Sequence, residues 1–219
     1  MKDVNRFMVA ILGALDGAEV AQVGDVVEAY LAKQDSDSRA WPTDAEVMAG
    51  LPKVKLYGNV RQSRLRVVLE ALEKQLRSGL NEDVSLPSGL QVEHLMPQGW
   101  RTYWDTDPKL SPAAAAERDR LVNTIGNLTL VTSTLNGTLS NRPWTDGETA
   151  ALVKAAGDLK GVGKRSLVSK FSLLALSRGV VENRPDTWTE TDIKNRSEQL
   201  AHALCQVWLG PPALATLTV

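Results

Sequence analysis

The fold depends on two short segments, Leu90-Gln-Val-Glu-His-Leu-Met-Pro-Gln98 and Asn123-Thr-Ile-Gly-Asn-Leu-Thr-Leu-Val-Thr132. Residues 90–92 predict a short strand, because they are β-prone and lie between a Pro-Ser-Gly turn sequence and a proline. Residues 127–132 are rich in branched side chains and predict a second strand. Residues 135–141 then predict one or two helical turns. The expected order in the middle of the chain is therefore strand, strand, short helix.

Helical patterns lie on both sides of this region. Apolar residues recur at helical spacing in three segments before it, namely 4–15, 26–31 and 63–77. Gly79 is the expected end of the third of these helices. After the strands, residues 164–178 predict one helix, and Thr189 with Asp192 predicts a capping box that opens the last helix. Between the strands, residues 98–120 predict a long polar connection.

The expected fold is therefore mostly α with a small embedded ββα motif. We expect three parts: a helical N-terminal subdomain at 1–79, a core at 80–145 and a helical C-terminal subdomain at 146–219. A chain of 219 residues with 43% hydrophobic residues can bury a core without disulfide cross-links.

Composition excludes several classes of protein. The single cysteine, Cys205, excludes an internal disulfide and a four-cysteine zinc site. No apolar run approaches the ~18 residues that a membrane span needs, so no membrane partner is expected. We expect a cytoplasmic protein.

Charge is distributed unevenly although the net charge is only −1. The first fifty residues are mainly acidic, whereas the stretches 53–77 and 142–178 are mainly basic. Two basic stretches can flank a phosphate-binding face. They can equally be solvated helix surfaces, and charge alone leaves both readings open.

The first segment brings an acid and an imidazole together, because Glu93 and His94 directly precede the Pro97 bend. The second strand and the short helix should bring Asn127, Asn136 and Asn141 into the same neighbourhood. Phosphodiester hydrolysis needs a base that titrates near neutrality, and histidine does so. It also needs a hard cation, and magnesium prefers carboxylate, amide and water oxygens to thiolates.

Three motifs together resemble an HNH endonuclease: Val-Glu-His-Leu-Met-Pro-Gln from Val92, Asn-x-x-Gly-Asn-Leu-Thr-Leu from Asn123, and Leu-Asn-x-x-Leu-Ser-Asn from Leu135. The closer match is to the C-terminal nuclease domain of GmrSD-type, modification-dependent restriction proteins, which act in phage defence and include phosphorothioate-sensing relatives. The similarity extends roughly from Trp41 to Pro211. It implies a ββα-metal (HNH, or His-Me finger) motif and a metal-dependent DNA endonuclease or nickase.

The resemblance assigns roles to individual residues. His94 resembles the base that activates water, and Asn127 matches the position that orients the histidine-bearing loop. Glu93 and Asn136 match metal-ligand positions, and Asn141 matches a supporting residue. The implied cofactor is a divalent metal ion, Mg²⁺ or Mn²⁺.

Structural readings compete with these roles. His94 could be a structural or surface histidine, and Glu93 faces away from the metal if side chains alternate along the strand. Asn127 and Asn136 each lie beside a glycine, which is also typical of turns. A catalytically silent DNA-binding or interaction module and an RNase with the same site are the two alternative functions.

DNA contacts are expected from four cations and two aromatic residues. The cations are Arg101, Arg142, Lys164 and Arg165, and the aromatic residues are Trp100 and Trp104. GmrSD-type proteins join the nuclease domain to an N-terminal sensor and nucleotide-handling domain. The sequence holds no G-x-x-x-x-G-K-[ST] phosphate loop. The chain is therefore expected to be either a standalone effector or a fragment whose sensor lies elsewhere in the protein or in a partner.

Overall fold

The computed structural model describes residues 2–36, 39–77, 85–104, 110–152 and 160–211. The chain divides into two compact units, one formed by Met1–Val47 with Trp208–Val219 and the other by Met48–Val207. The expected three-part division, with boundaries after residues 79 and 145, stays a prediction. Gly79, the expected helix end, lies outside the described residues.

The first unit is helical, as the periodicity predicts. Its elements are α1 (Lys2–Ala14), a 3-10 turn at Val20–Gln22, α2 (Val23–Ala32) and the first part of α3 (Asp44–Gly50). The rings of Phe7 on α1 and Tyr30 on α2 lie 5.9 Å apart. No described side chain of α1 or α2 is buried. Among the described helices of the whole chain, none has the length and apolarity to span a membrane.

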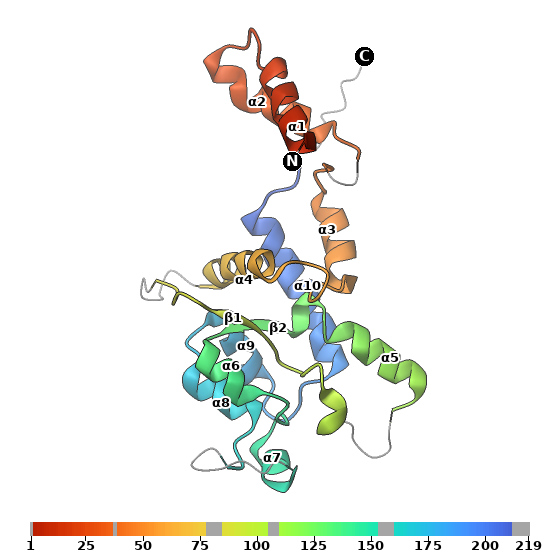
Figure 1. Cartoon of the computed structure of the whole chain (residues 1–219), viewed down its shortest axis with the longest axis vertical. Helices are drawn as coiled ribbons and strands as arrows, with labels where there is room; N and C mark the ends of the chain where they lie inside the picture. The colour runs from red at the N-terminus through yellow and green to blue at the C-terminus, as the bar shows by residue number, and fades with distance from the viewer. Residues whose placement is uncertain (1, 37–38, 78–84, 105–109, 153–159, 212–219) are drawn as a thin grey trace. The chain divides into compact units, whose positions relative to one another are not determined.

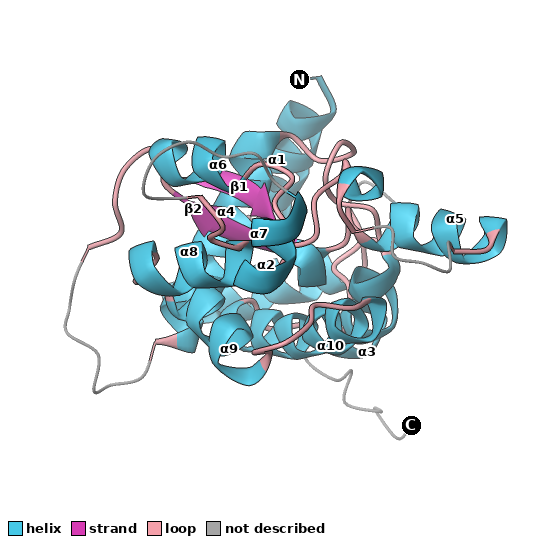
Figure 2. Ribbon diagram, turned by 90° about the horizontal axis from the view of Figure 1, so that it is seen from below, coloured by secondary structure: helices cyan, strands magenta, loops and turns pink. Residues whose placement is uncertain are grey.

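The second unit contains the expected strand–strand–helix order. Strands β1 (Gln91–His94) and β2 (Leu128–Val131) form a two-stranded antiparallel sheet in which His94 pairs with Leu128 (Figure 2, magenta). Helix α6 (Ser133–Leu139) follows β2 directly. The hydroxyl of Thr132 accepts a hydrogen bond from the backbone N–H of Leu135 and caps this helix.

The second unit also contains further helices (Figure 1). They are α4 (Gln62–Leu76), α7 (Asp146–Leu152), α8 (Lys164–Phe171), α9 (Ala175–Asn183) and α10 (Glu190–Val207). The prediction of one helix over 164–178 is wrong, because the chain leaves the helix at Ser172 and begins α9 at Ala175. The buried carboxylate of Glu73 accepts the backbone N–H groups of Ala175 and Leu176 and so stabilises the new helix start. The expected capping box at Thr189 and Asp192 is confirmed.

The prediction of a polar connection over residues 98–120 is also wrong in part. The segment contains a 3-10 turn at Trp100–Thr102 and helix α5 (Pro112–Leu121), which Ser111 caps. Four consecutive alanines at 113–116 have high helix propensity, although they give no apolar stripe. Helices α3 and α7 were not expected either.

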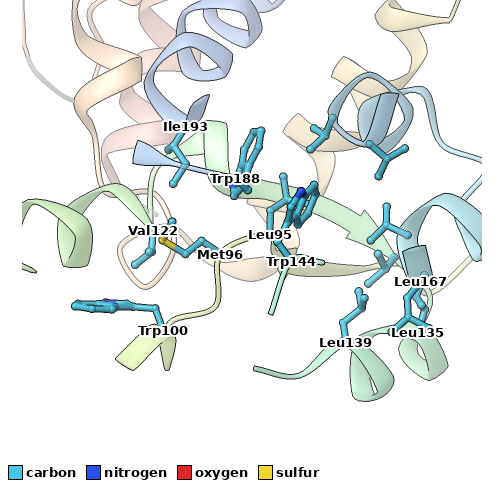
Figure 3. Close-up of a cluster of buried hydrophobic side chains, with 14 of the residues drawn as sticks. Leu95, Met96, Trp100, Val122, Leu135, Leu139, Trp144, Leu167, Trp188 and Ile193 are labelled. Carbon is cyan, nitrogen blue, oxygen red and sulfur yellow. The ribbon is translucent and has the colours of Figure 1, made fainter. Parts of the chain in front are cut away.

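Two hydrophobic clusters hold the sheet in place. Leu128 and Leu130 of β2 pack with leucines of α4 and α10, whereas Val131 belongs to a second cluster that includes Trp144 and Trp188 (Figure 3). Helix α10 also approaches the backbone at Gly126, where an added Cβ would lie 2.0 Å from the carbonyl oxygen of Ile193. The turn before β2 is therefore fixed against α10.

Candidate active site

A cavity of about 240 Å³ opens where β1 ends and α6 passes beside it. Its lining includes His94 from β1, Gln98 from the following loop, and Asn136 and Asn141 from α6 and its C-terminal turn. The strand pairing and the start of α6 directly after β2 explain why residues about 40 positions apart meet here. His94 and Asn136, predicted to lie together, do lie on one cavity.

His94 is buried, with only 7% of its surface exposed. Its Nε2 has no hydrogen-bond partner among the described residues. The ring meets the ring of Tyr57 edge-on, at a centroid distance of 4.3 Å. Burial, aided by the positive charge of Lys164 and opposed by the side chain of Asn123, lowers the pKa of His94 from 6.5 to about 4. The imidazole is therefore neutral at neutral pH.

Glu93 is buried beside His94 but is already paired. Its Oε1 accepts a hydrogen bond of 2.5 Å from the Lys164 ammonium, which also donates to the carbonyl oxygen of His94 at 2.6 Å. Lys164 is 1% exposed. The expected DNA contact by Lys164 is thus corrected, because an interior ammonium held by two acceptors does not face a phosphate in solvent.

Asn127 is completely buried and does not line the cavity. Its Oδ1 accepts from the backbone N–H of Met96 at 2.8 Å and from Trp188 Nε1 at 3.0 Å. Its Nδ2 donates to the carbonyl oxygens of Met96 at 2.7 Å and Val122 at 2.9 Å. Asn127 therefore holds the loop that follows His94, and its position is that of a structural, orienting residue.

The end of α6 presents two amides to the cavity. Asn136 Nδ2 donates to Gln91 Oε1 at 2.7 Å, and no described residue donates to its Oδ1. Ser140 has φ 42° and ψ −139°, a backbone region that strongly favours glycine. An added Cβ at Gly99 would lie 2.8 Å from Asn141 Nδ2, so the absence of a side chain at Gly99 lets Asn141 approach the loop. Such strain at a cavity edge is typical of functional sites.

The donor set suits a hard cation in type but carries little charge. The cavity offers the imidazole of His94 and the carboxylate of Glu93, whose Oε1 is paired with Lys164. Amide and hydroxyl oxygens of Gln98, Asn136, Ser140 and Asn141 complete the donor set. Amide oxygens are ligands that Mg²⁺ and Mn²⁺ accept. Within the described part of the chain, no group of three or more His, Cys, Asp or Glu side chains is placed to hold a metal. His94 lines the same cavity, and its buried Nε2 has no partner among the described residues, which fits a polar occupant.

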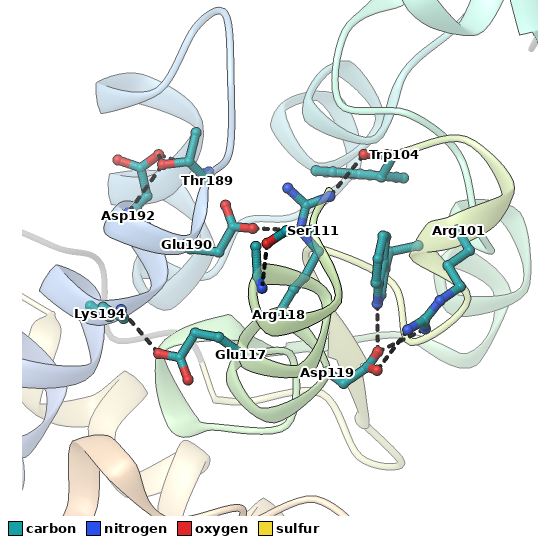
Figure 4. A network of polar contacts seen from close by, with 12 residues as sticks. Arg101, Trp104, Ser111, Glu117, Arg118, Asp119, Thr189, Glu190, Asp192 and Lys194 are labelled. Atoms are coloured by element: carbon teal, nitrogen blue, oxygen red, sulfur yellow. Dashed lines mark hydrogen bonds and ion pairs between the residues drawn. The ribbon is translucent and has the colours of Figure 1, made fainter. Parts of the chain in front are cut away.

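The three arginines expected to contact DNA differ in how they are engaged. Arg142 donates to the carbonyl oxygens of Thr138 and Val162, and Arg165 donates to that of Val181, so both have intramolecular roles. Arg101 is more exposed, forms a two-bond ion pair with Asp119 and lies 4.2 Å over the Trp100 ring (Figure 4). Of these cations, Arg101 is the most accessible to a phosphate.

The expectation that Trp100 and Trp104 face DNA is not supported. Trp100 is 1% exposed and donates through Nε1 to Asp119. Trp104 is partly buried and donates to the carbonyl oxygen of Arg142. Both indoles therefore brace the loop beside the cavity.

Sequence reasoning missed the support around His94. Asn123 Oδ1 accepts from Gln98 Nε2 at 2.8 Å, and the Asn123 carbonyl accepts the backbone N–H groups of Leu56 and Tyr57. Gln98 and Asn123 stand inside the quoted motifs and could have been singled out as polar residues. Tyr57 is distant in sequence, and no local pattern predicts that it meets His94.

Comparison with known proteins identifies a family. The family described as GmrSD restriction endonucleases, C-terminal domain, matches residues 41–203. No curated protein and no solved structure matches the chain. The matched region includes both strands, α6 and every residue that lines the cavity. The chain therefore belongs to the family of GmrSD restriction endonuclease C-terminal domains.

Proposed function

We propose that this chain is the nuclease effector domain of a modification-dependent restriction system and hydrolyses DNA phosphodiester bonds. The family supports the class of reaction, since its members are named restriction endonucleases. The observation that carries the residue assignment is that a neutral, buried imidazole, His94, shares a cavity with the amide of Asn136. The arrangement of β1, β2 and α6 agrees with a ββα nuclease motif.

His94 acts as the general base in this proposal. The neutral imidazole accepts a proton from a water molecule as the water oxygen forms its bond to phosphorus, and the bond from phosphorus to the leaving sugar oxygen breaks. Tyr57 fixes one side of the ring, while Asn127 holds the Met96 backbone just after it. The base is thereby oriented before substrate arrives.

A divalent cation, Mg²⁺ or Mn²⁺, completes the proposed site. Asn136 would hold it through Oδ1, with Ser140 and Asn141 as the adjacent oxygen donors. The ion would neutralise charge that develops on the phosphate and on the leaving oxygen. The residues of this chain position the base and form the cavity.

The proposed substrate and partner domain follow from the family. We propose DNA as the substrate and an N-terminal sensor and nucleotide-handling domain as the partner that supplies recognition of modified DNA in antiviral defence. Arg101, at the accessible side of the loop next to the cavity, is the proposed phosphate contact from this chain.

Incubation of the purified chain with supercoiled plasmid tests the function. Conversion to nicked or linear DNA in Mg²⁺ or Mn²⁺, and none in EDTA, is the expected result. DNA binding without any cleavage across magnesium, manganese, cobalt and nickel would show a silent binding module instead. Cleavage of a matched RNA with intact DNA would show an RNase.

A further inference from the structure

The guanidinium of Arg196 on α10 is buried, with 7% of the residue exposed. Its Nη1 donates to the carbonyl oxygens of Gly126 at 2.6 Å and Leu128 at 2.9 Å, and its Nη2 donates to that of Leu176 at 3.0 Å. A guanidinium has more N–H donors than these three bonds use, because it also carries the Nε–H. Among the described residues, no carboxylate forms an ion pair with Arg196.

Arg196 lines a cavity of about 460 Å³ between α9 and α10, which we call the α9–α10 cavity. Part of the lining is apolar and buried, namely Leu176, Val180 and Leu200. Exposed amide side chains line it as well, namely Asn183, Asn195 and Gln199. The α9–α10 cavity shares no lining residue with the cavity that contains His94. A charged group and several amides therefore meet at a second, separate cavity.

The other charges on the α9–α10 cavity do not balance Arg196. Arg184 and Asp192 line it too, and they form an ion pair with each other. The Asp192 carboxylate also accepts the backbone N–H and the hydroxyl of Thr189. The charged lining residues are two arginines and one aspartate, so the lining carries a net charge of +1. Burial lowers the pKa of Arg196 to about 9, which leaves the guanidinium charged at neutral pH.

This arrangement suits an anion. Backbone carbonyl groups satisfy hydrogen bonds of the Arg196 guanidinium but carry no net charge. A buried charge is costly unless an opposite charge compensates it. Guanidinium groups pair well with phosphate oxygens, and amide N–H groups can donate to the same oxygens. A terminal phosphate reaches a recessed guanidinium more readily than an internal phosphodiester does, because the latter has a sugar on both sides.

We propose that the α9–α10 cavity binds a terminal phosphate group, carried by a small molecule or by the end of a nucleic acid strand, and that Arg196 pairs with its charge. Arg196 also holds the carbonyl groups on either side of Asn127. An occupant of the cavity therefore stabilises the turn that carries Asn127. The inference does not depend on the proposed function, because it concerns a different cavity.

Titration of the whole chain with inorganic phosphate, in EDTA and at constant ionic strength, tests the proposal. We expect saturable binding by isothermal titration calorimetry. We also expect phosphate to raise the midpoint of thermal unfolding by about 2–4 °C relative to chloride, because a ligand that binds only the folded chain stabilises it. Absence of saturable binding by wild type would overturn the proposal.

Gln199→Glu assigns the binding to this cavity. It places a carboxylate on the cavity wall and leaves the three carbonyl bonds of Arg196 in place, so it should bind phosphate at least about tenfold more weakly. Gln62→Glu, at the exposed start of α4 and outside the cavity, adds the same charge and should bind like wild type. Equal phosphate affinities of the two variants would overturn the assignment. Arg196→Met is less informative, because it also leaves three carbonyl oxygens without their donor.

Competition distinguishes the two sources of the phosphate. Displacement of inorganic phosphate by a 5′-phosphorylated oligonucleotide, but not by the same strand without its phosphate, assigns the site to the end of a nucleic acid. Displacement by neither strand assigns it to a small phosphorylated molecule. Equal displacement by both strands would show that internal phosphodiesters suffice, and it would overturn the proposal of a terminal phosphate.

Discussion

Asn127 and His94 lie at the same end of the sheet, because His94 pairs with Leu128 and Asn127 directly precedes it. Both side chains are buried, but one is fully hydrogen-bonded and the other is not. The Asn127 amide makes four hydrogen bonds, to the backbone of Met96 and Val122 and to Trp188. The His94 ring has a buried Nε2 with no partner among the described residues. A buried polar atom without a partner costs free energy, whereas a satisfied one does not. The comparison therefore separates the part of the motif that provides stability from the part that is available for chemistry.

The largest expected effect is on activity, at His94. His94→Ala should reduce DNA cleavage by about 10²- to 10⁴-fold, because it removes the proposed general base. Folding and most DNA binding should remain. The assay is plasmid cleavage alongside circular dichroism. His202→Ala, at the exposed second histidine on α10, is the matched control and should cleave like wild type. Full metal-dependent cleavage by a verified His94→Ala preparation would reject the assignment.

Asn127→Ala should affect stability instead. It leaves two N–H donors and two carbonyl oxygens in the core without their partner, which should lower the free energy of unfolding by about 3 kcal/mol or more. Urea denaturation measures this change. Asn195→Ala, at an exposed position on α10, should change stability by no more than about 0.5 kcal/mol. Equal stability of the two variants would contradict the structural role of Asn127.

Acidification should reveal the cost of burying His94. The folded chain holds the pKa of His94 at about 4, below its ordinary value of 6.5. Protons therefore bind more readily to the unfolded chain, and the stability contribution present above pH 6.5 is lost as pH falls toward 4. The loss should reach at most about 3 kcal/mol. Denaturation of wild type and His94→Gln in EDTA across this range measures it. Parallel pH profiles for the two proteins would contradict the shift.

Substitutions at two glycines test the packing of the turn before Asn127 and of α6. Gly126→Ala places a methyl group against the Ile193 carbonyl of α10 and should destabilise the fold by about 1–3 kcal/mol. Gly137→Ala, on α6, meets nothing within 4 Å. It should stabilise the helix by about 0.5–1 kcal/mol. Thermal denaturation of both variants distinguishes them, and a destabilised Gly137→Ala would contradict the open space around residue 137.

The sequence predicted the elements that carry local patterns. The two strands, α6, α4 and the capping box of α10 follow from β-propensity, apolar spacing and cap residues, and all are confirmed. The break between α8 and α9 was missed, because it depends on Glu73, about 100 residues away, which caps the start of α9. Helix α5 was missed because its alanines give propensity without an amphipathic pattern.

The site was predictable to a similar degree. The meeting of His94 with Asn136 follows from strand pairing and from the short link between β2 and α6. The burial of Lys164 could not be predicted in this way, because a lysine at a helix start is ordinarily solvated. Only the tertiary fold, which brings the first residue of α8 near β1, places this ammonium on Glu93.

Anomalous scattering from crystals of the chain soaked in Mn²⁺ shows whether His94 and Asn136 share a cation site. We expect a manganese peak in the cavity lined by His94 and Asn136, beside a phosphate oxygen when a DNA oligonucleotide is present. Asn136→Ala crystals treated in the same way should lose the peak. A peak bound elsewhere on the chain, with this cavity filled by water in the presence of DNA, would contradict the claim.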